Sequence, residues 1–152
     1  MIIKNNLIHD NYRGIWLDWQ SQGTRVSGNI FYNNEKEDLF NEVNHGPMVV
    51  DNNIMLSEIS ILNASQGTAY AHNLITGKII IRKVANRYTP YHFSHSTSVK
   101  GLMTILTGDD RYYNNILTSN HQTKPYKGPA SDKIHNGLDA YDGYPLSSDY
   151  WY

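Results

Sequence analysis

Two short stretches of the chain, residues 14–19 (GIWLDW) and 38–43 (DLFNEV), carry apolar side chains at alternate positions. A period of two is typical of a β-strand, in which neighbouring side chains point to opposite faces of the sheet. The pattern therefore predicts two strands of similar length. One face of each strand is predicted to carry Ile15, Leu17 and Trp19 in the first and Leu39, Asn41 and Val43 in the second.

The other face of the two predicted strands brings two carboxylates into register. When the stretches are aligned, Trp16 lies over Phe40 and Asp18 lies over Glu42. Adjacent parallel strands are roughly 4.7–4.9 Å apart, and a retaining glycosidase needs two carboxyl groups roughly 5–5.5 Å apart. Asp18 and Glu42 are therefore a candidate catalytic pair. The alternative is that both are ordinary solvated side chains on an outward face.

An asparagine followed by two apolar residues recurs along the chain. It stands at Asn6, Asn29, Asn53, Asn73 and Asn115, so the intervals are 23, 24, 20 and 42 residues. Repeats of this length with short strand patterns and no amphipathic helical segment predict an all-β parallel β-helix, a solenoid. The last interval is nearly double, which indicates either a long insertion or a skipped turn. We expect the asparagines to stack at one corner and to hydrogen-bond along the stack.

The pattern also divides the chain. Residues 1–120 are expected to form the coils, with a long loop insertion at about residues 77–110, and residues 121–152 read as a loop-rich C-terminal segment because Pro, Gly, Ser and Asp dominate there. The chain starts inside a repeat and ends on the aromatic residues of 149–152, with no capping segment at either end. Because solenoids need caps, we expect a β-helix truncated at both ends, a fragment of a longer protein.

Composition narrows the classes of function. The chain has 152 residues, 17 of them Asn, and a formal net charge of −1, which gives no electrostatic case for binding nucleic acid or an anionic membrane surface. It contains no cysteine, which excludes disulfides and thiolate metal sites. No apolar run approaches the length needed to span a membrane. Localisation and assembly into a homo-oligomer are left open.

A second group of polar residues invites a metal-site interpretation. Imidazole and carboxylate are suitable metal ligands, and His92, His95, Asp109 and Asp110 lie within one segment. Their spacing is not diagnostic of any metal. Residues 109–111 (DDR) fit better as a charge pair at a coil corner or as a contact to a sugar hydroxyl. We therefore expect no metal and no cofactor.

Several motifs resemble those of the β-xylosidases of glycoside hydrolase family 120. They are GIWLDW at residues 14–19 with QGTRV at 22–26, and DLFNEVNHGP at 38–47. Further segments are TPYH at 89–92, HST at 95–97 and GDDRYYNN at 108–115. The resemblance runs through most of residues 1–117, and several of these motifs are long and ungapped.

The resemblance implies a right-handed parallel β-helix, to which the family adds a β-sandwich domain. It also implies retaining hydrolysis of terminal β-xylosyl units from short xylo-oligosaccharides, the expected partner of the chain. The family's nucleophile corresponds to Asp18 and its acid/base to Glu42. Side chains expected to bind substrate around this pair are Trp16, Trp19, His45, Tyr91 and His92.

The chain departs from the family in length. No segment resembles the sandwich domain, and the coils expected before Asn6 are missing, so a complete sugar subsite is not assured. Two other classes stay open, because a fold alone does not choose among functions. One is a polysaccharide lyase or epimerase, for which the face near Asp18 offers only Arg13 and Arg25 as cations. The other is a non-catalytic carbohydrate-binding β-helix.

Overall fold

The computed structural model describes residues 1–92, 96 and 98–118, and the predicted C-terminal segment at 121–152 lies outside these residues. The described part is all-β: it holds three parallel sheets and one antiparallel hairpin. No helix long and apolar enough to cross a membrane occurs within it. The prediction of an all-β fold is confirmed.

Each of the first four turns of the described chain contributes one strand to each of three sheets, and the next turn contributes a strand to two of them. Sheet A contains β1 (Ile2–Lys4), β4 (Arg25–Ser27), β7 (Met48–Asp51), β10 (Thr68–Ala71) and β15 (Arg111–Tyr113). Sheet B contains β2 (Leu7–His9), β5 (Ile30–Tyr32), β8 (Ile54–Met55), β11 (Leu74–Ile75) and β16 (Ile116–Leu117). Sheet C contains β3 (Ile15–Leu17), β6 (Glu37–Glu42), β9 (Ile59–Ala64) and β12 (Lys78–Ile81).

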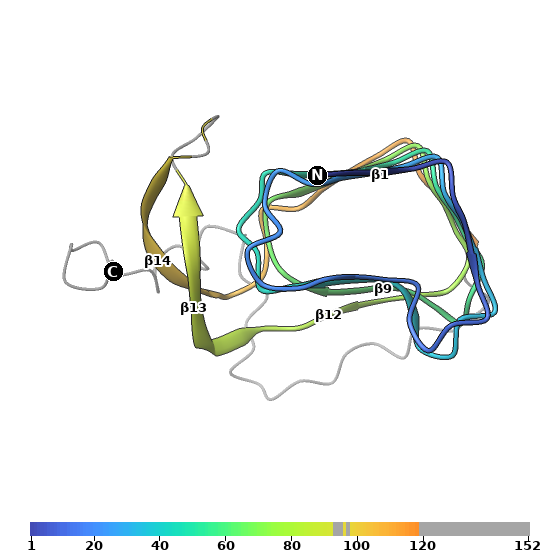
Figure 1. The fold of residues 1–152 in the computed structure, drawn as a ribbon, viewed down its shortest axis with the longest axis horizontal. Helices are drawn as coiled ribbons and strands as arrows, with labels where there is room; N and C mark the ends of the chain where they lie inside the picture. Colours follow the sequence, from blue (N-terminus) through green and yellow to red (C-terminus); the bar gives the residue numbers. More distant parts are fainter. Residues whose placement is uncertain (93–95, 97, 119–152) are drawn as a thin grey trace.

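The three sheets wrap into a right-handed parallel β-helix. Seen end-on, successive coils superimpose, with β1 of sheet A on one side and β9 and β12 of sheet C on the opposite side (Figure 1). The hairpin of β13 (Val84–His92) and β14 (Val99–Ile105) stands outside the coil, beside the end of β12 (Figure 1). The predicted β-helix is therefore confirmed.

An asparagine ladder runs along the corner between sheets A and B. The side-chain oxygen of Asn53 accepts hydrogen bonds from the backbone N–H and the side-chain amide of Asn29, at 2.9 and 3.0 Å. The amide of Asn53 donates in turn to the oxygen of Asn73 at 3.0 Å and to the carbonyl of Val26 at 3.0 Å. The pattern repeats from Asn6 to Asn115. The predicted stack is confirmed, and it satisfies backbone groups that would otherwise be buried unpaired.

The long interval in the repeat is an insertion and not a skipped turn. β10 pairs directly with β15, and β11 pairs directly with β16. Asn73 and Asn115, 42 residues apart, therefore hydrogen-bond as neighbours in the ladder. The hairpin β13–β14 occupies the extra chain length between these two coils.

Two hydrophobic clusters hold the fold. The first fills the interior of the coil with Ile15, Leu17, Val26, Phe31, Leu39, Met48, Val50, Met55, Ile61, Tyr70 and Ile75. The second lies on the outer side of sheet C, where Phe40, Val43 and Ala64 pack against Val84 and Ile105 of the hairpin. The hairpin thus covers part of an outward face, and it buries side chains that alternation alone would leave in solvent.

Two positions depart from the predicted alternation. β3 ends at Leu17, so Trp19 lies in the following turn with 46 % of its surface exposed, and it does not share the interior face. β6 ends at Glu42, and Val43 has a φ of 50°. That left-handed conformation, an outlier for a β-branched residue, turns Val43 into the outer cluster. The prediction that Trp19 shares one face with Leu17, and Val43 one face with Asn41, is wrong.

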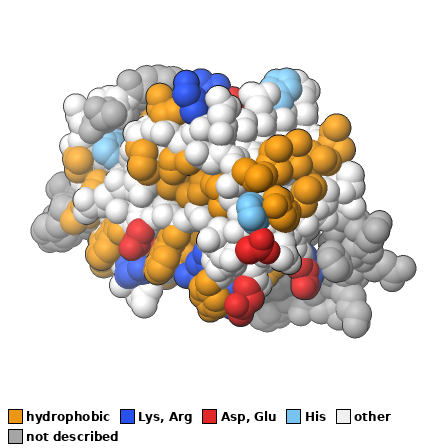
Figure 2. Space-filling view, turned by 45° about the vertical axis from the view of Figure 1, so that its right-hand side comes forward, with side chains coloured by type: hydrophobic (Ala, Val, Ile, Leu, Met, Phe, Trp, Pro, Cys, Tyr) orange, Lys and Arg blue, Asp and Glu red, His pale blue; other side chains and the backbone are white. Residues whose placement is uncertain are grey.

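The outer face of sheet B carries exposed apolar side chains. Leu7, Ile30 and Ile116 expose 59, 40 and 62 % of their surfaces. Figure 2 shows hydrophobic side chains gathered on the side of the molecule that comes forward in that view. This face lies across the coil from the hairpin, and it takes no part in the arrangement of carboxylates described next.

Candidate active site

The register of β3 and β6 is the one expected from the sequence. Ile15 pairs with Leu39, Trp16 with Phe40 and Leu17 with Asn41. Asp18 directly follows Leu17, the last residue of β3, and Glu42 directly follows Asn41 on β6, so the two residues come next along these adjacent chain segments. The amide of Asn44 bridges the two chain segments here, because it donates to the carbonyl of Leu17 at 3.4 Å.

The Glu42 carboxylate is buried and bonded on both oxygens. Only 7 % of the residue is exposed. Trp16 Nε1 donates to Glu42 Oε2 at 2.7 Å, and Arg87 Nη2 donates to Glu42 Oε1 in an ion pair. Indole and guanidinium groups only donate hydrogen bonds. Both oxygens therefore act as acceptors, which is the arrangement of an ionised carboxylate.

Asp18 occupies a more open position in the turn after β3. Its residue is exposed, and its Oδ1 accepts a hydrogen bond from the backbone N–H of Trp19 at 2.7 Å. The backbone N–H of Ser21 donates a hydrogen bond to Asn44 Oδ1 at 2.5 Å. This bond ties the turn to the residues that follow β6. The two carboxylates therefore sit in unlike environments, one exposed and one enclosed.

Aromatic and cationic side chains stack along the outer face of sheet C. Trp16 and Phe40 have their ring centroids 5.7 Å apart at an interplanar angle of 21°. The guanidinium of Arg13 lies 4.9 Å from the Trp16 ring centroid and 5.0 Å from that of Phe40, and it pairs with Glu37 at 2.6 Å. The stack fixes the plane of the Trp16 indole, and so the direction of its N–H towards Glu42.

His45 packs into the hairpin. Its Nε2 lies 3.1 Å from the carbonyl oxygen of Met103, so this nitrogen carries the proton. Burial, with a smaller contribution from nearby His92, lowers the pKa of His45 to about 4 against the opposing effect of the hydrogen bond to Met103. The ring of Tyr91 meets the His45 ring edge-on at 5.5 Å. His45 is therefore neutral at pH 7, with Nδ1 available as an acceptor and no hydrogen-bond partner for it among the described residues.

His92 ends β13 beside this pair. Both of its ring nitrogens are buried and have no hydrogen-bond partner within the part of the chain that the structure describes. His95 lies outside the described residues. Of the five predicted substrate-binding residues, Trp16 touches Glu42, Tyr91 touches His45, and Trp19 follows Asp18 in the turn.

Asp109 and Asp110 follow the hairpin in the sequence, after the end of β14. Asp109 forms an ion pair with Arg111 at 2.9 Å, so the predicted charge pair is confirmed. Asp110 accepts hydrogen bonds from Asn63 at 2.7 Å and from the backbone N–H of Thr68 at 3.0 Å. Burial raises the pKa of Asp110 to about 6 against these two bonds. Its contacts are those of a structural group that ties the insertion to the coil.

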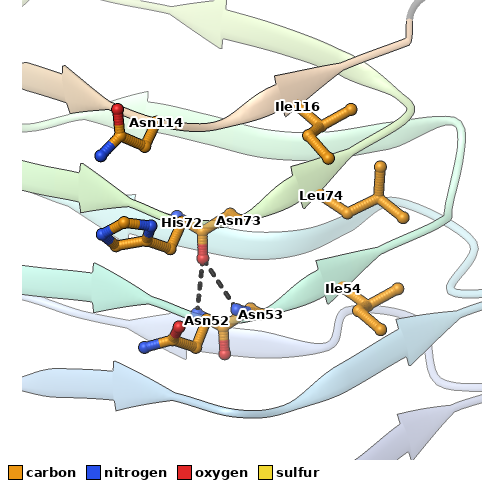
Figure 3. A pocket seen from close by; sticks show the side chains of 8 residues that line it. All are labelled: Asn52, Asn53, Ile54, His72, Asn73, Leu74, Asn114 and Ile116. Carbon is orange, nitrogen blue, oxygen red and sulfur yellow. Dashed lines mark hydrogen bonds between the residues drawn. The ribbon is translucent and has the colours of Figure 1, made fainter.

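A shallow pocket of about 350 Å³ lies elsewhere, at the corner between sheets A and B. Asn52, His72 and Asn114 line one side in successive coils, and Ile54, Leu74 and Ile116 line the other (Figure 3). The amides of the ladder, Asn53 and Asn73, are engaged with each other. The residues that line this pocket include no carboxylate.

The residue that sequence reasoning missed is Arg87. Only Arg13 and Arg25 were considered as cations near the site. The structure ties Arg13 to Glu37 and Arg25 to Asp51 on sheet A. Arg87 follows Glu42 by 45 residues, and it reaches the carboxylate because β13 folds back over sheet C. The sequence offered one signal for this contact: Arg87 is a basic residue that stands two positions before the TPYH motif at residues 89–92.

Comparison with known proteins gives one informative match. No protein-family model matches the chain, and no curated protein does. A solved structure, the complex of XylC with xylose, matches at 57 % sequence identity and a TM-score of 0.70 over 76 % of this chain. The match supports the assignment of the chain to glycoside hydrolase family 120. The resemblance seen in its motifs is thereby confirmed.

The match covers 18 % of the XylC chain. The present chain therefore spans less than one fifth of the length of that relative. The matched part includes three quarters of the present chain, at an identity that leaves no doubt about the fold. XylC was solved with xylose bound.

Proposed function

We propose that the chain carries the catalytic carboxylates of a retaining β-xylosidase that removes terminal β-xylosyl units from xylo-oligosaccharides. The observation that supports the proposal is the position of two unlike carboxylates at the ends of adjacent strands of sheet C: an exposed Asp18 that directly follows β3 and an enclosed Glu42 that ends β6. The relative solved with xylose supports the choice of sugar.

In the first step Asp18 attacks the anomeric carbon of the terminal xylose. The bond to the glycosidic oxygen breaks, and protonated Glu42 gives its proton to that oxygen. A covalent xylosyl ester of Asp18 remains. The exposed position of Asp18 suits the attacking group, because an ionised carboxylate needs access to the sugar and loses little solvation there.

In the second step Glu42 acts as base. It takes a proton from a water molecule whose oxygen attacks the anomeric carbon, and the ester bond to Asp18 breaks. Xylose leaves with its original configuration. Trp16 and Arg87 hold Glu42 as a carboxylate ion, which is the form that this step requires.

His45, Tyr91, His92 and Trp19 are proposed to contact the sugar. His45 offers Nδ1 as an acceptor for a sugar hydroxyl, because its Nε2–H is engaged by Met103. The two ring nitrogens of His92 are also without protein partners among the described residues. Exposed Trp19 offers an aromatic face beside Asp18.

The test is hydrolysis of p-nitrophenyl β-xyloside by the purified chain, beside the Asp18→Asn and Glu42→Gln variants. We expect weak turnover, lowered by on the order of 10³-fold or more in each variant. Azide should restore turnover in Glu42→Gln and yield a β-xylosyl azide, because azide needs no base. Absence of turnover by the folded chain would refute the proposal that this chain is an enzyme.

Two outcomes would favour the other classes. Xylo-oligosaccharide binding without turnover, unchanged in Asp18→Asn, would indicate a carbohydrate-binding β-helix. An unsaturated product from a uronate polymer would indicate a lyase. Both measurements use the same purified chain, so the three classes are compared under one set of conditions.

A further inference from the structure

Glu42 faces conflicting requirements in the proposed reaction, on which this inference rests. As an acid it must carry a proton, and as a base it must be ionised. The two groups bonded to it, Trp16 Nε1–H and the Arg87 guanidinium, are both donors. The oxygen of Glu42 that carries the proton has one acceptor position fewer, and its O–H must point at the glycosidic oxygen. The acid step is therefore favoured when one of the two donors releases its oxygen.

The two donors differ in their freedom to move. The Trp16 indole is stacked on Phe40 and lies under the guanidinium of Arg13, which hold its plane. Arg87 stands on the hairpin, its side chain is 34 % exposed, and it reaches Glu42 through a long flexible stem. Arg87 is the donor able to leave, because solvent can take over its hydrogen bonds.

The base of the hairpin fixes the position of the Arg87 backbone. Val84 and Ile105 are buried against Phe40, Val43 and Ala64. The middle of the hairpin is tied to the same region by the hydrogen bond from Gln22 to the carbonyl of Pro90 at 3.2 Å. Arg87 lies between these two anchors, so its backbone is held over Glu42 while its side chain stays free to swing.

We propose that Arg87 is the positioning residue of Glu42: its guanidinium holds the carboxylate in the orientation of a general base and releases Oε1 when Glu42 acts as an acid. In the base step the proton passes from water to Glu42, while the oxygen of that water displaces the Asp18 carboxylate from the anomeric carbon. Arg87 itself exchanges no proton, since guanidinium stays charged.

The charged groups around Glu42 are few in the described part of the chain. Arg87 is bonded to it from β13, and Asp18 follows β3 at the adjacent register position. Arg13 and Arg82 lie over the neighbouring Phe40 ring at 5.0 and 5.9 Å. None of these replaces the contact of Arg87 with Oε1.

The first test reads the site without turnover. The indole ¹H–¹⁵N signals of Trp16 and Trp19 are recorded by NMR in the wild-type chain and in Arg87→Gln. Without Arg87 the Glu42 side chain is free to rotate, so the Trp16 Nε1–H signal should move upfield, in the direction that Glu42→Gln moves it. The Trp19 signal should stay in place.

Arg25→Gln is the matched control, since Arg25 also forms a partly exposed ion pair with a buried carboxylate, Asp51, but on sheet A. It should leave the Trp16 signal unchanged. If Arg87→Gln leaves that signal unchanged while Glu42→Gln moves it, the proposal is overturned. If Arg87→Gln does not fold, Glu42→Gln gives the reciprocal measurement: the slowly rotating guanidinium signals of Arg87 must collapse, and their persistence overturns the proposal.

The second test uses turnover of an activated aryl xyloside, whose leaving group needs little acid assistance. Arg87→Gln should lower turnover about tenfold, azide should restore it, and Arg87→Lys should retain part of it because a cation remains. Azide should restore nothing in Asp18→Asn. Loss in Arg87→Gln that azide does not restore would overturn the positioning role. Failure of the wild-type chain to turn over would refute the proposed function and leave the NMR result to decide on Arg87.

Discussion

The indole nitrogen of Trp16 donates a 2.7 Å hydrogen bond to Oε2 of Glu42, a residue 26 positions later in the chain. The contact crosses from β3 to β6. It is diagonal, because the backbone of Trp16 pairs with Phe40, and Glu42 lies two residues further along β6. It links the aromatic stack on the outer face of sheet C to the buried carboxylate. The stack and the carboxylate therefore form one unit.

Removing this hydrogen bond should weaken the unit without dismantling the stack. Trp16→Phe keeps an aromatic ring against Phe40 but removes the N–H. We expect the free energy of unfolding to fall by about 1.5 kcal/mol, the lower end for a bond to a charged group, because Trp16 is half exposed. Urea unfolding measures the change. Trp19→Phe, in the adjacent turn, is the control and should change it less.

The asparagine ladder should be most sensitive in its middle. Asn53→Ala removes a side chain that accepts two hydrogen bonds from Asn29 and donates to Asn73 and to the Val26 carbonyl. We expect a loss of about 3 kcal/mol in urea unfolding, because buried backbone and amide groups lose their partners. Asn6→Ala, at the exposed start of the ladder, should cost about 1 kcal/mol or less. Equal losses at the two positions would contradict a cooperative ladder.

His45 should make stability depend on pH. Its pKa is lowered from 6.5 to about 4 by burial, so the folded state binds fewer protons than the unfolded state between these values. The stabilising effect is fully present above pH 6.5 and is lost as the pH falls towards 4, by about 3 kcal/mol in total. Unfolding by urea at several pH values, compared with His45→Gln, isolates it. A wild-type advantage that does not shrink between pH 7 and pH 4 would show that His45 is not buried as described.

Asp110 should act in the opposite sense. Burial raises its pKa from 3.8 to about 6, so the folded state binds more protons than the unfolded state in that interval. Its contribution is fully present below pH 3.8 and is lost as the pH rises through 6, by about 3 kcal/mol. Asp110→Asn, measured by the same urea series, should therefore gain on the wild type as the pH rises from 4 to 7. A constant difference would contradict the burial of this carboxyl.

The scaffold could be predicted because its signals are local and repeated. Alternation at Trp16 and Phe40, combined with the interval between coils, was enough to give the register of β3 and β6. The recurring asparagines were enough to give the ladder, because amides stacked at one corner satisfy one another. Each conclusion needed only the side-chain period of a strand and the length of one coil.

The surroundings of Glu42 could not be predicted in the same way. Glu42 was placed on an outward face, where solvent would be expected, but the hairpin covers it. Arg87 reaches it from an irregular insertion, in which no repeat relates one residue to another. Val43 departs from the strand because a left-handed residue ends β6 there, and a β-branched residue gives no sequence signal for that conformation.

The insertion leaves the hydrogen-bond registers of sheets A and B intact, since β10 pairs with β15 and β11 with β16 as though the hairpin were absent. The coils, which carry Asp18 and Glu42, and the hairpin, which encloses Glu42, are therefore structurally separable. Changes in the length or sequence of residues 84–105 can reshape access to Glu42 while the coils keep their stacking.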